Sequence, residues 1–260
     1  MKIIVCIKQV PDTNEVKLDP VTNTLIRDGV PSIINPDDKA GLEAALVLKD
    51  LHGATVTVVS MGPPQADLAL REALAMGADE AVLVTDRKFG GADTWATSST
   101  LASAIKKLGY DLIITGRQAI DGDTAQVGPQ IAEHLGIVNV SYAEGIELKG
   151  DSVIIKRQYE DRYHMIKAKL PCLLTALTGM NEPRYMTVGG IFDAYREKEV
   201  KILTRDDLDV DEANIGLKGS PTRVVKSFTK EAKGQGQIVT LDPQESVNWM
   251  LEKMQEKFIL

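Results

Sequence analysis

Residues 111–136 are DLIITGRQAIDGDTAQVGPQIAEHLG, and this stretch decides the fold. It opens with Asp111–Gly116, a short, β-branched and almost wholly apolar run. Such a run is typical of a parallel β-strand that is buried on both faces of a sheet. A polar segment with glycines follows, and a helical pattern then continues to Gly136. The order predicts one unit of an α/β fold, with the polar loop at the carboxyl end of the strand.

The first half of the chain repeats this alternation. Three more runs of the same kind lie at residues 2–8, 54–60 and 80–85. Helical segments separate the strands and each stops at a glycine: Asn35 to Gly53, about Gln65 to Gly77, and about Thr94 to Gly109. The first helix follows Asn-Pro-Asp-Asp, which supplies an N-cap, a proline at the first helical position and acids in the first turn. Strands that alternate with helices predict a doubly wound, mostly parallel sheet.

After Gly136 the pattern changes. Residues 147–160 predict a β-hairpin that turns at Gly150-Asp151, and the runs HMIKAKLP and CLLTAL add further strand. We interpret this part as an antiparallel extension of the sheet. NEPRY, Asn181–Tyr185, marks the end of the compact core, so residues 1–185 are expected to form one α/β domain.

The remainder of the chain predicts an arm. From Glu197 onward the sequence is charged and has few large apolar clusters, so it cannot alone offset the entropic cost of ordering. An amphipathic helix is nevertheless predicted at residues 242–258, where Asp242 can cap the helix before Pro243. Its apolar stripe consists of Val247, Met250, Leu251, Met254 and Phe258. Residues 197–260 are therefore expected to wrap around a surface of this chain or of another one.

Composition excludes several classes of protein. The formal net charge is −7, so a nucleic-acid partner is not expected. No apolar run reaches the roughly 18 residues that span a bilayer, and the opening MKIIVCIKQV predicts a first strand rather than a signal peptide. Two distant cysteines, Cys6 and Cys172, give neither a disulfide framework nor a metal spacing, which favours the cytoplasm.

The familiar catalytic and phosphate-binding motifs are absent. The sequence has no GxGxxG after a strand, no GxxxxGK[ST], no HExxH and no GxSxG. Catalysis by side chains and a metal site therefore have little support. If the protein takes part in a reaction, a cofactor carries the chemistry.

The segment Gly116–Leu135 allows two interpretations. As a ligand loop, it offers glycines for close backbone approach, Arg117 for a phosphate or a ring, and the free N–H groups of the next helix for an anion. Asp121 and Asp123 would then bond ribose hydroxyls or base donors, or Asp123-Thr124 would cap the helix. The alternative is an ordinary connection with a well-capped helix, and the residues alone do not separate the two.

Three other segments should converge on the same edge of a parallel sheet. They are Cys6–Gln9 after the first strand, Asn35–Asp38 before a helix, and Ser60–Pro63 after the second strand. Cys6 is more simply a small buried apolar residue than a reactive thiol, and Lys8 more simply a solvated strand end.

Six motifs in order resemble a known family. They are KQVPD at 8–12, Asn35-Pro36, ALAMGAD at 73–79, GRQAIDGDTAQVGP at 116–129, Leu170-Pro171 and NEPRYM at 181–186. Together they resemble the beta subunit of an electron-transfer flavoprotein over essentially the whole chain. Each motif alone is modest, but the ordered set is specific.

The resemblance implies a function. Members of the family pair with an alpha subunit that holds FAD in a mobile domain, and the beta subunit holds a second nucleotide. That nucleotide is AMP in housekeeping members. In electron-bifurcating members it is FAD, which accepts a hydride from NADH. One electron then goes to ferredoxin or flavodoxin, and the other goes through the alpha flavin to an acyl-CoA dehydrogenase or a similar partner.

Departures from the AMP-type pattern favour the bifurcating branch. AMP-type members resemble KQAIDDDCNQTGQ in the loop, whereas this chain has Gly122, Thr124, Ala125 and Val127 at the variable positions. VPDT at 10–13 and VGGIFDAY at 188–195 also resemble the bifurcating members. Losing polar groups that hold a terminal phosphate would let a diphosphate continue to a flavin, near a helix that starts at Asp93–Ser98. The AMP type and a stand-alone nucleotide-binding module are the alternatives.

Carried over residue by residue, the resemblance implies two sets of site residues. The nucleotide would be held by Cys6, Ile7, Lys8, Asn35, Asp38, Met61, Asp93, Thr94, Thr97, Gly116, Arg117, Gln118, Ala119, Asp121, Gly122, Asp123, Thr124, Ala125, Gln126 and Val127. A loop over residues 186–196 would dock the dehydrogenase through Val188, Ile191 and Phe192, unless it is a plain exposed linker. The arm, residues 197–260, would pack on the alpha subunit.

Overall fold

The computed structural model describes residues 1–12, 31–225, 234 and 236–260. The described chain divides into two units, Met1–Val224 and Val225–Leu260. Thr13 of the VPDT motif and residues 226–233 and 235 of the predicted arm lie outside the described residues.

The first unit is built on a nine-stranded sheet with the order β11-β5-β4-β1-β6-β10-β7-β8-β9. Pairing is parallel from β11 to β7 and antiparallel from β7 to β9. The predicted mostly parallel sheet with an antiparallel extension is therefore confirmed. The strands are β1 (Lys2–Cys6), β4 (Thr55–Met61), β5 (Glu80–Val84), β6 (Leu112–Gly116), β7 (Val138–Lys149), β8 (Ser152–Gln158), β9 (Tyr163–Lys169), β10 (Cys172–Ala176) and β11 (Val200–Leu203).

The run CLLTAL lies elsewhere than we expected. Its core, β10, is not part of the antiparallel extension but pairs in parallel with β6 on one side and β7 on the other. Cys172 stands opposite Leu112 and Val138 in these two ladders. All five residues of β10 are buried, which suits a strand covered on both faces.

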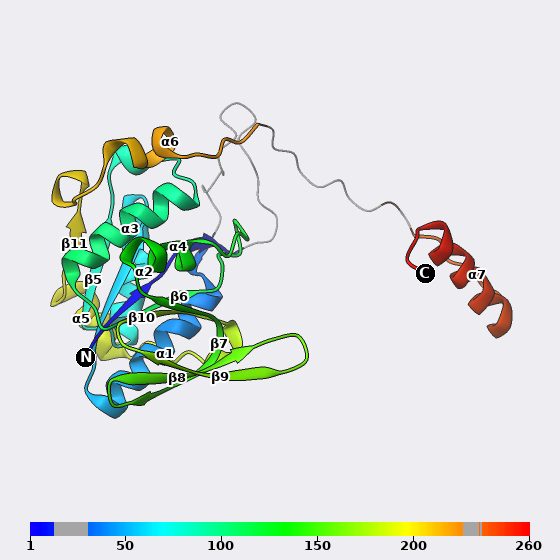
Figure 1. Cartoon of the computed structure of the whole chain (residues 1–260), viewed down its shortest axis with the longest axis horizontal. Helices are drawn as coiled ribbons and strands as arrows, with labels where there is room; N and C mark the ends of the chain where they lie inside the picture. The colour runs from blue at the N-terminus through cyan, green and yellow to red at the C-terminus, as the bar shows by residue number, and fades with distance from the viewer. Residues whose placement is uncertain (13–30, 226–233, 235) are drawn as a thin grey trace. The chain divides into compact units, whose positions relative to one another are not determined.

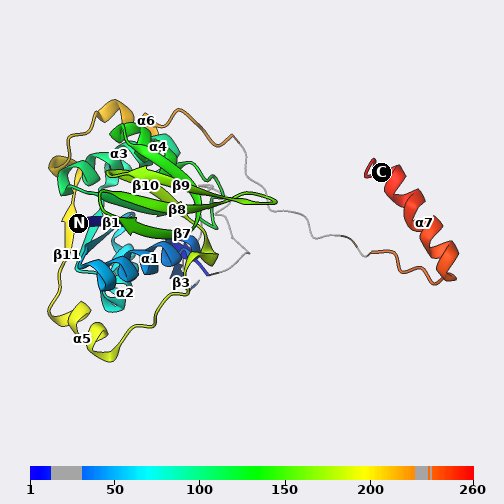
Figure 2. The ribbon, with the colours of Figure 1, turned by 60° about the horizontal axis from the view of Figure 1, so that its bottom comes forward.

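Helices cover both faces of the sheet (Figures 1 and 2). α1 (Pro36–His52) and α2 (Asp67–Met76) pack on one face, and α3 (Thr94–Leu108) and α4 (Val127–Leu135) pack on the other. Side chains of β1 alternate between the two core layers: Ile3 and Val5 join the first, and Ile4 joins the second. This alternation is the period of two that every strand imposes.

The structure confirms most of the predicted helix ends, but not the start of α4. α1 follows Asn35 and stops at Gly53, whose φ of 65° is left-handed. Asp93 caps α3 by accepting a hydrogen bond from the Ala96 N–H at 3.0 Å. α4, however, begins only at Val127 and has no side-chain cap. The prediction that Asp123-Thr124 caps this helix was therefore wrong.

Residues 186–196 are mostly helical rather than a loop, which corrects the sequence-based expectation. α5 spans Val188–Arg196 and packs on α2. Gly190 permits this close approach, because a Cβ there would collide with the carbonyl oxygen of Ala75. Packing on α2 therefore stabilises α5, although the two glycines of α5 disfavour a helix.

The boundary of the predicted arm also needs correction. β11 pairs in parallel with β5 at the edge of the sheet, so the chain after Glu197 returns to the domain. α6 (Gly216–Gly219) then lies beside α3 (Figures 1 and 2). The first unit consequently extends to Val224 instead of ending near Tyr185.

Shorter elements complete the first unit. A two-stranded antiparallel sheet, β2 (Gln9–Pro11) and β3 (Ser32–Ile34), was not predicted. Short 3-10 turns are η1 (Pro64–Ala66), η2 (Arg87–Phe89), η3 (Thr178–Met180), η4 (Arg205–Asp207) and η5 (Glu212–Asn214).

The second unit contains α7 (Pro243–Glu256). Asp242 accepts a hydrogen bond from the Glu245 N–H at 2.9 Å, as the predicted cap requires. None of the residues of α7 is buried by the described chain. Among the described helices, none combines the length and the apolar character needed to cross a membrane.

Candidate functional site

The carboxyl ends of β1, β4 and β6 meet at one edge of the sheet, which we call the rim. Because β1 pairs in parallel with both neighbours, Cys6, Met61 and Gly116 end adjacent strands there. The segment Arg117–Gln126, which we call the rim loop, leaves this edge and leads into α4. The structure therefore brings together the segments that the sequence predicts to converge.

Asn35 fixes the middle of the rim loop. Its amide nitrogen donates to the carbonyl oxygen of Gln118 at 2.8 Å, and its amide oxygen accepts from the Ile120 N–H at 3.0 Å. The side chain is completely buried. Asn35 thus serves the loop backbone as a donor and an acceptor, just ahead of α1.

Asp38 joins the ends of two strands. Its carboxylate accepts hydrogen bonds from the N–H of Lys8 at 2.8 Å and from the N–H of Gly116 at 2.9 Å. Burial raises the pKa of Asp38 to about 7, although these hydrogen bonds oppose the shift. Burial likewise raises the pKa of the Cys6 thiol to about 12, so Cys6 is the small buried residue that we favoured from the sequence.

Asp37 is a site residue that the sequence analysis missed. It accepts hydrogen bonds from the N–H and the hydroxyl of Thr178, which follows β10. Its other oxygen lies 3.5 Å from Nε of Arg117. That Nε is buried and makes no hydrogen bond among the described residues, so the Asp37 carboxylate is its nearest charged neighbour. The only sequence signal was its place as the first of two acids in the first turn of α1.

Lys8 and Asp121 form an ion pair across the site. Nζ of Lys8 lies 2.6 and 2.8 Å from the two carboxylate oxygens of Asp121. The side chain of Asp121 is only 5% exposed, whereas that of Lys8 is 44% exposed. Lys8 is therefore more than a solvated strand end, because it compensates a buried charge.

The start of α4 has the properties of an anion site. Asp123 and Ala125 have left-handed φ values of 52° and 53°, and the cap residue Gln126 returns to right-handed backbone. Such alternation turns successive N–H groups toward one side. The first turn of a helix contributes further N–H groups, because they have no partner within the helix. No side chain caps the first turn of α4, so the N–H groups of that turn are available to a phosphate, whereas the N–H of Asp123 is bonded to the carbonyl oxygen of Ala119.

The start of α3 lies next to the start of α4. The hydroxyl of Thr94 donates to the side-chain oxygen of Gln126 at 2.9 Å. Thr97 lies one turn further along the same half-exposed helix face. The carboxylate of Asp93, by contrast, is engaged with Ala96 and with Thr222 far along the chain.

The predicted nucleotide-binding residues thus fall into two groups at the rim. The first group has almost no exposed surface and holds the protein together: Cys6, Ile7, Asn35, Asp38 and Gly116. The second group keeps some exposed surface: Lys8, Met61, Asp93, Thr94, Thr97, Arg117, Gln118, Ala119, Asp121, Gly122, Asp123, Thr124, Ala125, Gln126 and Val127. Within this group, however, the side chain of Asp121 is paired with Lys8 and the carboxylate of Asp93 is bonded to Ala96 and Thr222.

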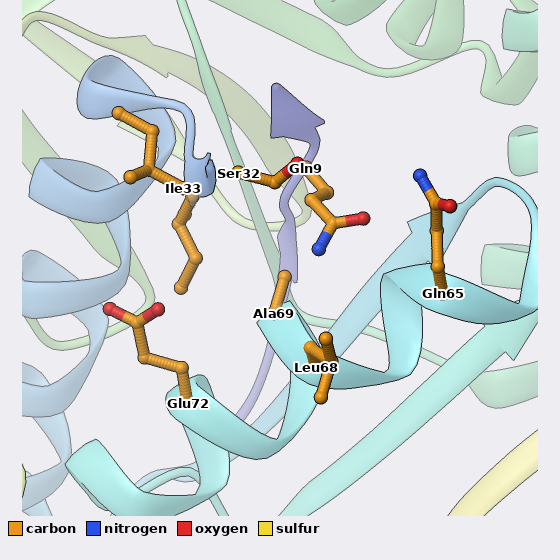
Figure 3. Close-up of a pocket in the computed structure, with 8 residues that line it drawn as sticks. Gln9, Ser32, Ile33, Gln65, Leu68, Ala69 and Glu72 are labelled. Atoms are coloured by element: carbon orange, nitrogen blue, oxygen red, sulfur yellow. The ribbon is translucent and has the colours of Figure 1, made fainter. Parts of the chain in front are cut away.

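A cavity of about 280 Å³ lies beside the rim, between α2 and the small β2–β3 sheet (Figure 3). Figure 3 shows Gln9, Gln65 and Leu68 around it, with Glu72 at its other end. None of the predicted nucleotide-binding residues lines this cavity. The rim loop, rather than the cavity, is therefore the candidate site.

Comparisons with known proteins decide the family. Residues 22–208 match the model of the electron transfer flavoprotein domain. The chain is 63% identical to the electron transfer flavoprotein subunit beta of Clostridium acetobutylicum, covering 99% of each chain. This chain belongs to the electron transfer flavoprotein family. It is also 55% identical to the caffeyl-CoA reductase–Etf complex subunit CarD of Acetobacterium woodii, over the whole of both chains. The acryloyl-CoA reductase electron transfer subunit gamma of Anaerotignum propionicum is 48% identical, again over both chains in full.

In this electron transfer flavoprotein chain, the NEPRY motif positions α5. Arg184 makes an ion pair with Glu43 of α1 at 2.8 Å and a second one with Asp50 at 2.8 Å. Glu43 is buried, and its hydrogen bonds raise the pKa of Arg184 above the ordinary value. The segment before α5 is thereby fixed to α1.

The predicted partner-binding residues lie apart from the rim loop, on α5. Val188 is 88% exposed, Phe192 58% and Ile191 40%. On its other side α5 contacts α2, where the guanidinium of Arg71 lies 5.1 Å from the ring centre of Tyr195. α5 is thus a supported helix with an exposed apolar surface.

Proposed function

We propose that this chain is the beta subunit of an electron-bifurcating electron transfer flavoprotein and that it holds FAD at the rim. The observation that carries the proposal is the start of α4, which faces the rim with no side-chain cap. Beside it lies Arg117, whose partly exposed side chain carries a positive charge. An anionic ligand with phosphates would satisfy the free N–H groups of this turn and would be attracted by that charge.

The residues at the variable positions of the rim loop support a ligand longer than a mononucleotide. Gly122 has open space where a side chain would stand, and Ala125 and Val127 offer no polar group to hold a terminal phosphate. Thr94 and Gln126 connect the starts of α3 and α4. A diphosphate bound at α4 would therefore continue toward Thr94 and Thr97, which supports FAD over AMP.

Each group of residues would have its own task in binding. Asn35 bonds the backbone of the rim loop, and Asp38 bonds the strand ends at Lys8 and Gly116. The ion pair between Lys8 and Asp121 ties the loop to the end of β1, and Arg117 supplies a positive charge. The carboxylates repel phosphate, so they favour the hydroxyls of a ribose or the donors of a base. When bound, the flavin would accept hydride from NADH and divide the electrons between ferredoxin or flavodoxin and an acyl-CoA dehydrogenase-type partner.

The names of the relatives support this assignment of partners. Two of them are subunits of a caffeyl-CoA reductase complex and of an acryloyl-CoA reductase. We propose an alpha subunit as the permanent partner, bound by the second unit, Val225–Leu260. We further propose that the exposed apolar residues of α5 dock the dehydrogenase.

Counting cofactors tests the assignment. The chain is purified together with its alpha subunit, the complex is extracted, and FAD and AMP are quantified per heterodimer. Two FAD molecules and no AMP are expected. One FAD and one AMP would assign the chain to the housekeeping type instead. A chain that purifies as a stable monomer, indifferent to the alpha subunit, would be a stand-alone nucleotide-binding module.

A further inference from the structure

The segment between β11 and the second unit is bonded along the length of α3. We call residues 204–222 the strap. The hydroxyl of Ser103 donates to the carbonyl oxygen of Asp209 at 2.9 Å, and Lys107 donates to that of Asp207. Further on, the N–H of Leu217 donates to the carbonyl oxygen of Gly90 at 3.0 Å. The strap thus runs toward the first turn of α3, which lies at the rim.

The last residue of the strap, Thr222, is bonded to Asp93, the cap residue of α3. The N–H and the hydroxyl of Thr222 donate to Oδ2 of Asp93 at 3.0 and 2.8 Å. The hydroxyl of Ser220 accepts from the N–H of Asp93 at 2.8 Å. Oδ1 of the same carboxylate accepts from Ala96 of the helix. We call the bonds between Asp93 and Thr222 the clasp.

Along the chain, the clasp joins a residue next to Thr94 to a residue shortly before the second unit. On one side, Thr94 follows Asp93 directly and is bonded to Gln126 of the rim loop. On the other side, the second unit begins at Val225, three residues after Thr222. The carboxylate of Asp93 therefore both caps α3 and binds Thr222, which lies three residues before the second unit.

We propose that the clasp between Asp93 and Thr222 is a positioning contact that couples nucleotide binding at the rim to docking of the second unit on the alpha subunit. This rests on the proposed function. Asp93 acts here through α3 and not by touching the ligand. A ligand that orders the first turn of α3 also orders the clasp, and the arm then leaves the domain from a fixed point. Such coupling is reciprocal, because each binding event changes the affinity of the other by the same factor.

The electrostatics of Asp93 agree with a permanently charged acceptor. Partial burial alone would raise its pKa, but the hydrogen bonds from Ala96 and Thr222 outweigh burial and hold the pKa below its ordinary value. Hydrogen bonds to a charged acceptor are stronger than those between neutral groups. The clasp is consequently made in full at neutral pH.

The test uses the heterodimer with its nucleotide removed and then titrated with FAD. Thr222→Val removes the hydroxyl of the clasp, while Thr222→Ser keeps it. Thr204→Val is the matched control, because the Thr204 hydroxyl also donates to a carboxylate of the strap, that of Asp207, at 2.8 Å. We expect Thr222→Val to weaken FAD binding about three- to tenfold, and the other two variants to bind FAD like the unchanged protein.

A second measurement separates coupling from a structural defect. The affinity for the alpha subunit is compared with and without FAD; Thr222→Val should lower it by the same factor only when FAD is present. Equal losses in Thr222→Val and Thr204→Val, or an alpha-subunit affinity that changes equally in both conditions, would overturn the proposal. If the heterodimer takes AMP and not FAD, the assignment to the bifurcating type fails, and the same titration with AMP tests the clasp.

Discussion

Asp38 is buried, and its carboxyl group accepts two backbone hydrogen bonds that favour its charged form. Its two hydrogen bonds, from Lys8 and Gly116, satisfy N–H groups at the ends of two strands. An acid in the first turn of α1 is also favoured by the helix dipole. Burial opposes both effects and dominates, which raises the pKa to about 7. The residue that joins the strand ends is therefore sensitive to pH near neutrality.

The stability of the chain should carry a pH dependence from Asp38. Its pKa rises from 3.8 to about 7 on folding, so the folded state binds more protons between these values. The free energy of unfolding therefore falls as pH rises through this window, by about 4 kcal/mol for the full shift. Denaturant unfolding of the unchanged protein and of Asp38→Asn should show this contribution lost in the variant. Carbon-13 NMR should place the titration midpoint of Asp38 near 7, and a midpoint below 5 would contradict the prediction.

Sequence reasoning identified the rim residues better than it identified their tasks. Asn35 and Asp38 were expected to line the nucleotide, but their side chains bond the backbone of Gln118, Ile120, Lys8 and Gly116. Partners 30 to 85 positions away in the chain leave no local signal. The cap predicted at Asp123 fails because Asp123 and Ala125 take left-handed φ values of 52° and 53°, so α4 begins only at Val127.

At the scale of single elements, prediction succeeded where local pattern and fold agree. Apolar β-branched runs gave the parallel strands, and glycines gave the ends of α1, α2 and α3. α5 was missed because Gly189 and Gly190 weaken helix propensity, while packing on α2 overrides it. The position of β10 between β6 and β7 depends on pairing across the chain, which a strand's own residues do not encode.

The exposed surface of α5 should act in docking and not in cofactor binding. Val188→Glu places a charge where an apolar anchor is proposed, so electron transfer to the dehydrogenase should slow about tenfold. Bound flavin should stay unchanged, because α5 lies apart from the rim loop. Stopped-flow kinetics at several dehydrogenase concentrations, with flavin content measured in parallel, provide the check. Loss of flavin in Val188→Glu would refute this division of tasks.

Gly190→Ala offers a complementary variant of the same element. The added Cβ would collide with the carbonyl oxygen of Ala75, so α5 must move while Val188 and Phe192 keep their identity. Overpacking of this kind costs about 1 to 3 kcal/mol. Slower transfer in this variant would show that the position of α5 matters as well as its composition.

At the scale of the whole molecule, burial is divided unequally between the two units. All residues of both core clusters lie before Val224, and none of the residues of α7 is buried by the described chain. Val247, Met250 and Leu251 on α7 are each 44 to 52% exposed. An amphipathic helix gains its stability mainly from a covered apolar face. The cover for this face is the alpha subunit in our proposal.

Removing residues 226–260 should therefore separate folding from assembly. The shortened chain keeps its core clusters, its rim and the clasp at Thr222, so its Tm should change by no more than about 2 °C. Copurification with the alpha subunit should be lost.

In the full-length chain, Leu251→Glu should weaken assembly without altering the Tm, because the residue is half-exposed and contributes nothing to the core. Val188→Glu is the control, because it introduces the same charged side chain at an exposed apolar residue of α5, and it should assemble normally. If Leu251→Glu and Val188→Glu assembled equally well, the alpha subunit would have to bind elsewhere, and the apolar face of α7 would need another partner.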